Sequence, residues 1–156
     1  MYMENEINKT NTVHHTLAHS YIVYFLILII GISLDLFFPI KIFHNSFALP
    51  FGFIFLLLAT LIVLWAQKSS RDLLKKENVT KEHFCRGPYC YTRTPTHWGL
   101  LFLALGLGFI LNAFFVIVFS LFSFIITKIT LVKKQEKFLE EKYGTPYMEY
   151  KKTVRF

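Results

Sequence analysis

The chain has 156 residues, enough for one domain; 54% of them are hydrophobic and 18% are aromatic. A soluble domain of this size could not bury that much apolar surface, so the composition excludes a soluble globular protein and indicates an integral membrane protein. The net charge is +7, and in a membrane protein the placement of the charges matters more than their sum.

Two apolar segments follow a polar arm, 1–20, that carries three histidines. Residues 21–40 and 47–66 are each about 30 Å long as helices, the thickness of the hydrocarbon core. We expect the histidines of the arm to be solvated and to bind no metal, because they have no cysteine or acidic partner set. We expect Asp35, near the outer end of the first span, to reach the interface or to pair near Lys41.

The third apolar block, 98–132, contains a single charged residue, Lys128. As one helix it would be about 52 Å long, too long for a bilayer, and Asn112 offers a place to turn. Both flanks of the block are basic, which places them on one side of the membrane. The sequence therefore predicts a helical hairpin and an all-α integral membrane protein with four transmembrane helices.

The basic residues predict the orientation of the single membrane domain. Of 17 Lys and Arg residues, 7 lie in the loop 67–97 and 7 in the tail 133–156. We therefore expect a multi-pass protein with its N-terminus, this loop and its C-terminus in the cytoplasm. The tail predicts two helices, with Gly144 ending the first and Thr145-Pro146 capping the second. Cys85 and Cys90 have no second pair, so we expect free thiols.

The segment "GPYCYTRTPTHWG", 87–99, concentrates polar and aromatic side chains before the hairpin. Pro95 can begin a helix, whose first N–H groups and positive dipole end can hold a carboxylate or phosphate beside Arg93. Tyr89, His97 and Trp98 offer flat faces for an adenine ring or a sulfonium. The alternative interpretation is an interfacial aromatic belt with no site.

Two signatures in this sequence resemble those of the membrane methyltransferases, which include isoprenylcysteine carboxyl methyltransferases and phospholipid N-methyltransferases. The first signature is matched by Gly87, Tyr89, Arg93, Pro95 and Gly99. The second is matched by Gln135-Glu136, Tyr143-Gly144, Tyr147, Tyr150 and Arg155. The hairpin separates them, and the resemblance covers residues 50–156.

The resemblance implies an enzyme that takes a methyl group from S-adenosylmethionine in a cytosolic pocket and passes it to an acceptor from the bilayer. It implies catalytic roles for Arg93 and Glu136. We expect Glu140 and Glu141 of the same helix to be solvated charges. The implied cofactor contacts are Lys81, Glu82, His83, Phe84, Tyr89, Thr94, Pro95, Thr96, His97 and Gln135. The implied partners are membrane lipids and a lipid, lipidated or small hydrophobic acceptor, with no metal and no nucleic acid.

The sequence departs from the family pattern at four positions. Thr94 replaces a histidine, His97 a tyrosine, Gln135 a glutamate and Leu131 an arginine that binds the carboxylate of prenylcysteine substrates. Two alternatives stay open, the first because of the departures at Thr94 and Gln135 and the second because the sterol reductases share a related C-terminal architecture. The first is a non-catalytic protein on the same scaffold, and the second is a membrane oxidoreductase that resembles the sterol reductases and uses a nicotinamide cofactor.

Overall fold

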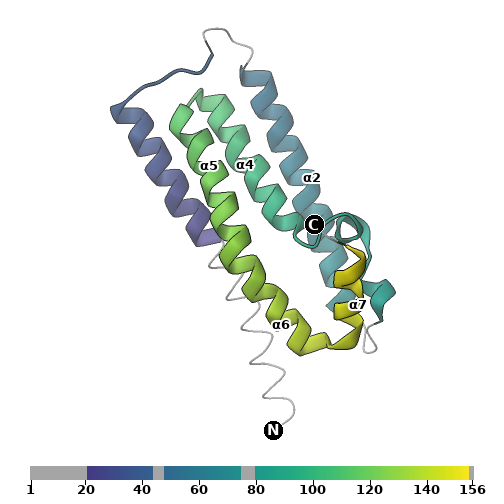
Figure 1. Cartoon of the computed structure of the whole chain (residues 1–156). Helices are drawn as coiled ribbons and strands as arrows, with labels where there is room; N and C mark the ends of the chain where they lie inside the picture. The colour runs from purple at the N-terminus through teal and green to yellow at the C-terminus, as the bar shows by residue number, and fades with distance from the viewer. Residues whose placement is uncertain (1–20, 44–47, 75–79, 155–156) are drawn as a thin grey trace.

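The structure is a computed structural model that describes residues 21–43, 48–74 and 80–154. The predicted arm 1–20, Lys75, Lys76 and Arg155 lie outside the described residues. Within these ranges the chain is helical and contains no strand. The helix Tyr21–Phe37, α5 (Phe114–Thr127), α4 (Pro95–Leu111) and α2 (Ala48–Leu74) lie side by side in that order across the bundle (Figure 1).

The predicted hairpin is confirmed. Pro95 occupies the first turn of α4, and Asn112 ends that helix in the left-handed conformation with φ 50°. The Asn112 side chain also fixes the connection that leaves the first helix, because its Oδ1 accepts hydrogen bonds from the backbone N–H groups of Ile42 and Phe43. The turn at Asn112 therefore closes the end of the bundle that lies away from α6 (Figure 1).

Helix α2 is longer than the sequence predicted. It runs through 27 residues to Leu74, so the segment 67–74, for which the sequence predicts a polar loop, continues the helix. No glycine or proline interrupts the sequence between Trp65 and Asn78, and nothing else in it stops a helix. The extension carries polar side chains of α2 beyond the apolar part of the bundle.

Helix α5 continues without a break into the tail, whose own helix starts at Lys133. A π-helical turn, Lys128–Val132, joins α5 to α6, Lys133–Tyr143. Gly144, with φ 61°, then breaks the helix as predicted, and α7, Thr145–Thr153, folds back. The cap of α7 is Gly144 rather than Thr145, which is the first helical residue. Figure 1 shows α7 returning towards the end of α2.

Among the residues that the structure describes, two helices are long and apolar enough to cross a membrane: Ala48–Leu73 and Phe114–Tyr143. Two shorter apolar helices, Tyr21–Phe37 and Pro95–Leu111, accompany them. Each of these has 17 residues and is about 25 Å long, slightly less than the hydrocarbon core. The structure thus has the helices of a membrane bundle, and the four-span topology and its orientation stay predictions.

Small residues allow α2 and α4 to approach closely. A Cβ added at Gly52 would lie 2.8 Å from the carbonyl oxygen of Gly106, and one added at Gly106 would lie 3.0 Å from that of Gly52. Such contacts let two helix backbones meet in an apolar medium, where dispersion and packing replace the hydrophobic effect as the force between helices. This interface fixes where the start of α4 lies relative to the end of α2.

Asp35 has a structural role that differs from the expected pairing near Lys41. Its carboxylate accepts hydrogen bonds from the backbone N–H groups of Phe115, at 3.2 Å, and Val116, at 3.0 Å. These are among the first N–H groups of α5, which have no partner within that helix. The negative charge also complements the positive end of the α5 dipole. The first helix thereby caps α5 through its side chain.

We predict that Asp35→Ala destabilises the bundle by about 1–2 kcal/mol, because two N–H groups of α5 lose their acceptor. Asp35→Asn should retain part of this stability, because the amide oxygen still accepts. Ser33→Ala is the matched control, since the Ser33 hydroxyl donates only to Ile29 within its own helix. The measurement is thermal unfolding in detergent, and equal midpoints for Asp35→Ala and Ser33→Ala would contradict the capping role.

Candidate functional site

A cavity of about 440 Å³ lies where the end of α2, the segment before α4, α6 and α7 come together. The extension of α2 contributes one wall, lined by Gln67, Ser69, Ser70, Arg71 and Leu73. Sequence reasoning missed these residues, and the uninterrupted helical sequence beyond Trp65 was the signal that could have found them. The volume falls within the range of small-molecule sites in proteins.

Seven of the residues expected to contact a cofactor or to take part in catalysis line this cavity: His83, Phe84, Tyr89, Arg93, Thr94, Thr96 and Gln135. They come from opposite ends of the hairpin and meet because the hairpin returns the chain. Lys81 and Glu82 are exposed on α3, Lys81–Phe84, and do not line the cavity. Glu136 is not on the lining either, but it contacts a residue that is.

Arg93 and Glu136 form an ion pair across the two ends of the hairpin. Arg93 Nη1 lies 2.7 Å from Glu136 Oε1, and the two side chains are 17% and 14% exposed. A pair so shielded from water is less screened by salt than a surface pair. The structure therefore brings together the two residues for which the family resemblance implies catalytic roles, and the Arg93 guanidinium lies at the cavity wall.

Lys151 of α7 extends this pair into a network. Its Nζ lies 3.0 Å from Glu136 Oε2 and 2.6 Å from Glu140 Oε1. Glu140 is thus paired, contrary to the expectation of a solvated charge. Glu140 and, less strongly, Glu136 raise the pKa of the Lys151 ammonium. Sequence reasoning missed Lys151, because its partners lie across the break at Gly144 rather than at helical spacing.

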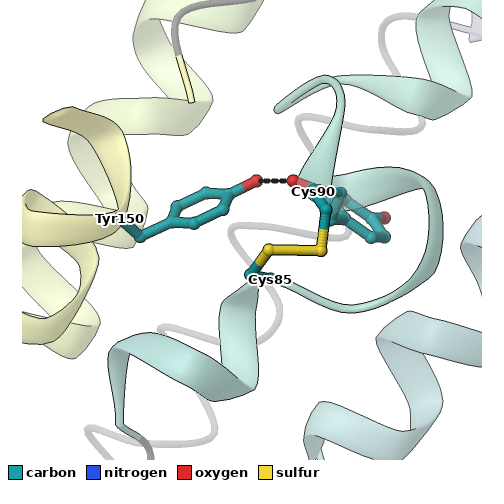
Figure 2. Close-up of a disulfide and its surroundings, with 4 residues drawn as sticks. Cys85, Cys90 and Tyr150 are labelled. Carbon is teal, nitrogen blue, oxygen red and sulfur yellow. Dashed lines mark hydrogen bonds between the residues drawn. A yellow bond between two sulfur atoms is a disulfide. The ribbon is translucent and has the colours of Figure 1, made fainter. Parts of the chain in front are cut away.

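Aromatic rings close the cavity on the side of α7. Phe84 packs against Tyr143, Tyr147 and Tyr150, with ring centroids 5.1, 5.4 and 5.5 Å away. Burial raises the pKa of the Tyr147 and Tyr150 phenols, so both stay neutral hydrogen-bond donors at physiological pH. The Tyr150 hydroxyl donates a 2.6 Å hydrogen bond to the carbonyl oxygen of Tyr89 (Figure 2).

The expectation of two free thiols is wrong, because Cys85 and Cys90 form a disulfide (Figure 2). The bond closes a short loop around η1, Gly87–Cys90, next to the carbonyl to which Tyr150 donates. Gly87 is required there for two reasons. Its φ is +54°, and a side chain on it would collide with Ser69 and Trp65 of α2. The loop before α4 is therefore held by its contact with α2, by the hydrogen bond from Tyr150 of α7 and by its own disulfide.

His83 and His97 have different surroundings. The backbone N–H of Thr80 donates to His83 Nδ1 at 3.0 Å, which leaves the proton of the neutral ring on Nε2. His97 is 3% exposed and its ring lies away from the cavity, as does the buried Pro95. Among the described residues neither ring nitrogen of His97 has a hydrogen-bond partner. The geometry therefore does not support the predicted cofactor contact at Pro95 and His97, whereas His83 lines the cavity.

The fold and the site together define a helical membrane protein with a polar and aromatic cavity at the end of its bundle. The model of the phospholipid methyltransferase family matches residues 47–146. This match covers well over half of the chain and contains most of the cavity, and the chain belongs to the phospholipid methyltransferase family. Neither the curated proteins nor the solved structures yield a match to the chain.

We predict that Lys151→Met loosens α7, because Glu136 and Glu140 lose the ammonium that joins them to it. Hydrogen exchange of the α7 amides should become about tenfold faster, and Lys152→Met, which changes an exposed neighbour, should leave exchange unchanged. Because the pKa of Lys151 is raised, the stability that its ion pairs give to α7 is fully present below the ordinary lysine pKa. This stability is lost as the pH rises through the raised pKa. Equal exchange in the two variants would refute the role of Lys151.

Proposed function

We propose that this protein is an S-adenosylmethionine-dependent methyltransferase that methylates a phospholipid or another lipid-soluble acceptor. The Arg93–Glu136 pair at the wall of a 440 Å³ cavity is the observation that carries the proposal. Membership of the phospholipid methyltransferase family supports both the reaction and a lipid substrate. The apolar bundle beneath the cavity supports an acceptor that arrives from the bilayer.

The residues that line the cavity fit the chemistry of this cofactor. Arg93 and the N-terminus of α4, which begins after Thr94, suit the carboxylate of an amino acid. Phe84, Tyr89 and Tyr147 supply rings for an adenine and for a sulfonium cation. Bound there, S-adenosylmethionine would supply a methyl group carried on a positively charged sulfur.

The polar residues at the cavity then have separate roles in binding the cofactor. Arg93 binds and orients the carboxylate, and Glu136 acts as a positioning residue that holds the Arg93 guanidinium. Thr94 and Gln135 replace the charged or ionisable residues of the family pattern with neutral groups that still donate and accept hydrogen bonds. These two departures remain compatible with binding because the cavity keeps Arg93 as its cation.

The packing around the cavity would favour methyl transfer by positioning. Transfer requires the acceptor, the methyl carbon and the sulfur to lie in line, and holding reactants in such a geometry can lower a barrier by several kcal/mol. Phe84, Tyr147 and Tyr150 form a packed cluster with Val154 that excludes water from one side. The loop fixed by Cys85 and Cys90 holds Tyr89 on the other side.

The first test is equilibrium binding of radiolabelled S-adenosylmethionine to the detergent-solubilised protein. We predict saturable binding that weakens about tenfold or more in Glu136→Gln, because the Arg93 guanidinium loses its orienting partner. Glu141→Gln removes an equal charge from an exposed position of the same helix and should bind as the unmodified protein does. Absence of binding by the folded unmodified protein would sink the proposal.

The second test concerns the reaction itself. The protein is incubated with methyl-labelled S-adenosylmethionine and a total membrane extract, and we predict label in the phospholipid fraction. Cofactor binding without label in any lipid or protein would identify a non-catalytic member of the scaffold. Hydride transfer from a labelled nicotinamide cofactor, without methyl transfer, would identify an oxidoreductase instead.

A further inference from the structure

A second hollow, of about 330 Å³, lies against the outer side of the segment that precedes α4. Its lining is dominated by aromatic rings. The rings come from Trp65 of α2, Tyr91 of the loop, and Trp98 and Phe102 of α4, and Ile62, two prolines and Thr92 complete the lining. None of these residues lines the first cavity.

The two hollows share a wall that is one chain thick. Along residues 88–96, side chains from one short stretch of chain are divided between the two hollows. Pro88, Tyr91, Thr92 and Pro95 line the aromatic hollow, whereas Tyr89, Arg93, Thr94 and Thr96 line the cavity beside the Arg93–Glu136 pair. A ligand in the aromatic hollow would therefore lie directly behind the residues proposed to bind the cofactor.

The lining of the aromatic hollow favours one kind of cation. Aromatic faces attract cations, with the strongest attraction on tryptophan. A primary ammonium carries N–H groups that would lose hydrogen bonds to water in this hollow. The lining residues include no carboxylate, and their side-chain acceptors are the hydroxyls of Thr92 and Tyr91. A trimethylammonium group has no N–H and loses none, so the hollow distinguishes methylated from unmethylated ammonium.

The hollow lies at the outer surface of the bundle, because two of its rings are exposed. Tyr91 is 78% exposed and Trp65 is 51% exposed, and Trp65 follows the apolar stretch of α2 where an interfacial residue is expected. A ligand can therefore enter from the membrane surface without any movement of the helices. We propose that this hollow binds the trimethylammonium head group of a membrane lipid.

The proposed binding does not depend on catalysis. If the proposed function holds, this binding also has a role in the reaction. Successive methyl transfers to an amine head group end at the quaternary ammonium, which cannot be methylated again. A site that selects this group, one chain away from the cofactor cavity, would hold the final product. An acyl chain is the competing occupant of so apolar a hollow, and it would show no preference between head groups.

The two tryptophans of the chain, Trp65 and Trp98, both line the hollow, so intrinsic tryptophan fluorescence reports on it directly. The full-length protein, in nanodiscs of phosphatidylglycerol without cofactor, is titrated with dihexanoyl phosphatidylcholine or dihexanoyl phosphatidylethanolamine below their micelle concentrations. We expect a saturable change in emission with the choline lipid and about tenfold weaker binding of the ethanolamine lipid. Equal responses to the two lipids, or no response to either, would overturn the proposal.

Tyr91 gives the matched variants, because it is exposed and both tryptophans remain as reporters. Tyr91→Leu should weaken binding of the choline lipid about two- to fivefold, whereas Tyr91→Phe, which keeps the ring, should bind as the unmodified protein does. Phe122→Leu, an exposed aromatic of α5 outside the hollow, is the control. If Tyr91→Leu and Phe122→Leu bind alike, the aromatic faces are not the binding element. Since no step uses the cofactor, failure of methyl transfer leaves this result intact.

Discussion

The ion pair between Arg93 and Glu136 is the contact on which the candidate site depends. The two residues precede and follow the apolar hairpin, so they can meet only if the chain turns back at Asn112. Their side chains are mostly shielded from water, where an unpaired charge would be costly, and this cost favours the geometry that pairs them. Lys151 then joins α7 to the same carboxylate, which closes the cavity from a third direction.

The loop before α4 is the other fixed part of the site. It is held by the Cys85–Cys90 disulfide, by the hydrogen bond from Tyr150 to Tyr89 and by the contact of Gly87 with α2. The basic residues predict that this loop faces the cytosol, where thiols are normally kept reduced. A disulfide at that place would form only on oxidation, so the redox state of Cys85 and Cys90 reports which compartment the loop faces.

The sequence predicted those elements whose causes are local. Pro95 begins α4, Asn112 turns the hairpin and Gly144 breaks the tail because each of these residues restricts or permits particular backbone angles wherever it stands. The family signatures likewise identified Arg93 and Glu136, which the structure brings into contact.

The features that sequence reasoning missed depend on contacts between distant segments. Lys151 pairs across a helix break, and Asp35 caps a helix that begins 79 positions later, at Phe114. The extension of α2 to Leu74 has a different cause, because the first charged residues after Trp65 mark the edge of the apolar stretch and not the end of the helix. The position of His97 in the signature predicts a cofactor contact, but its side chain is buried within the bundle.

A double-mutant cycle between Arg93 and Glu136 tests the central claim most directly. The free energy of unfolding in detergent is measured for Arg93→Gln, Glu136→Gln, the double variant and the unmodified protein. A direct contact of this kind predicts a coupling energy of about 1–3 kcal/mol, with the second substitution costing much less than the first. Additive costs, with coupling near zero, would show that the two ends of the hairpin do not meet, and the shared cavity would be contradicted.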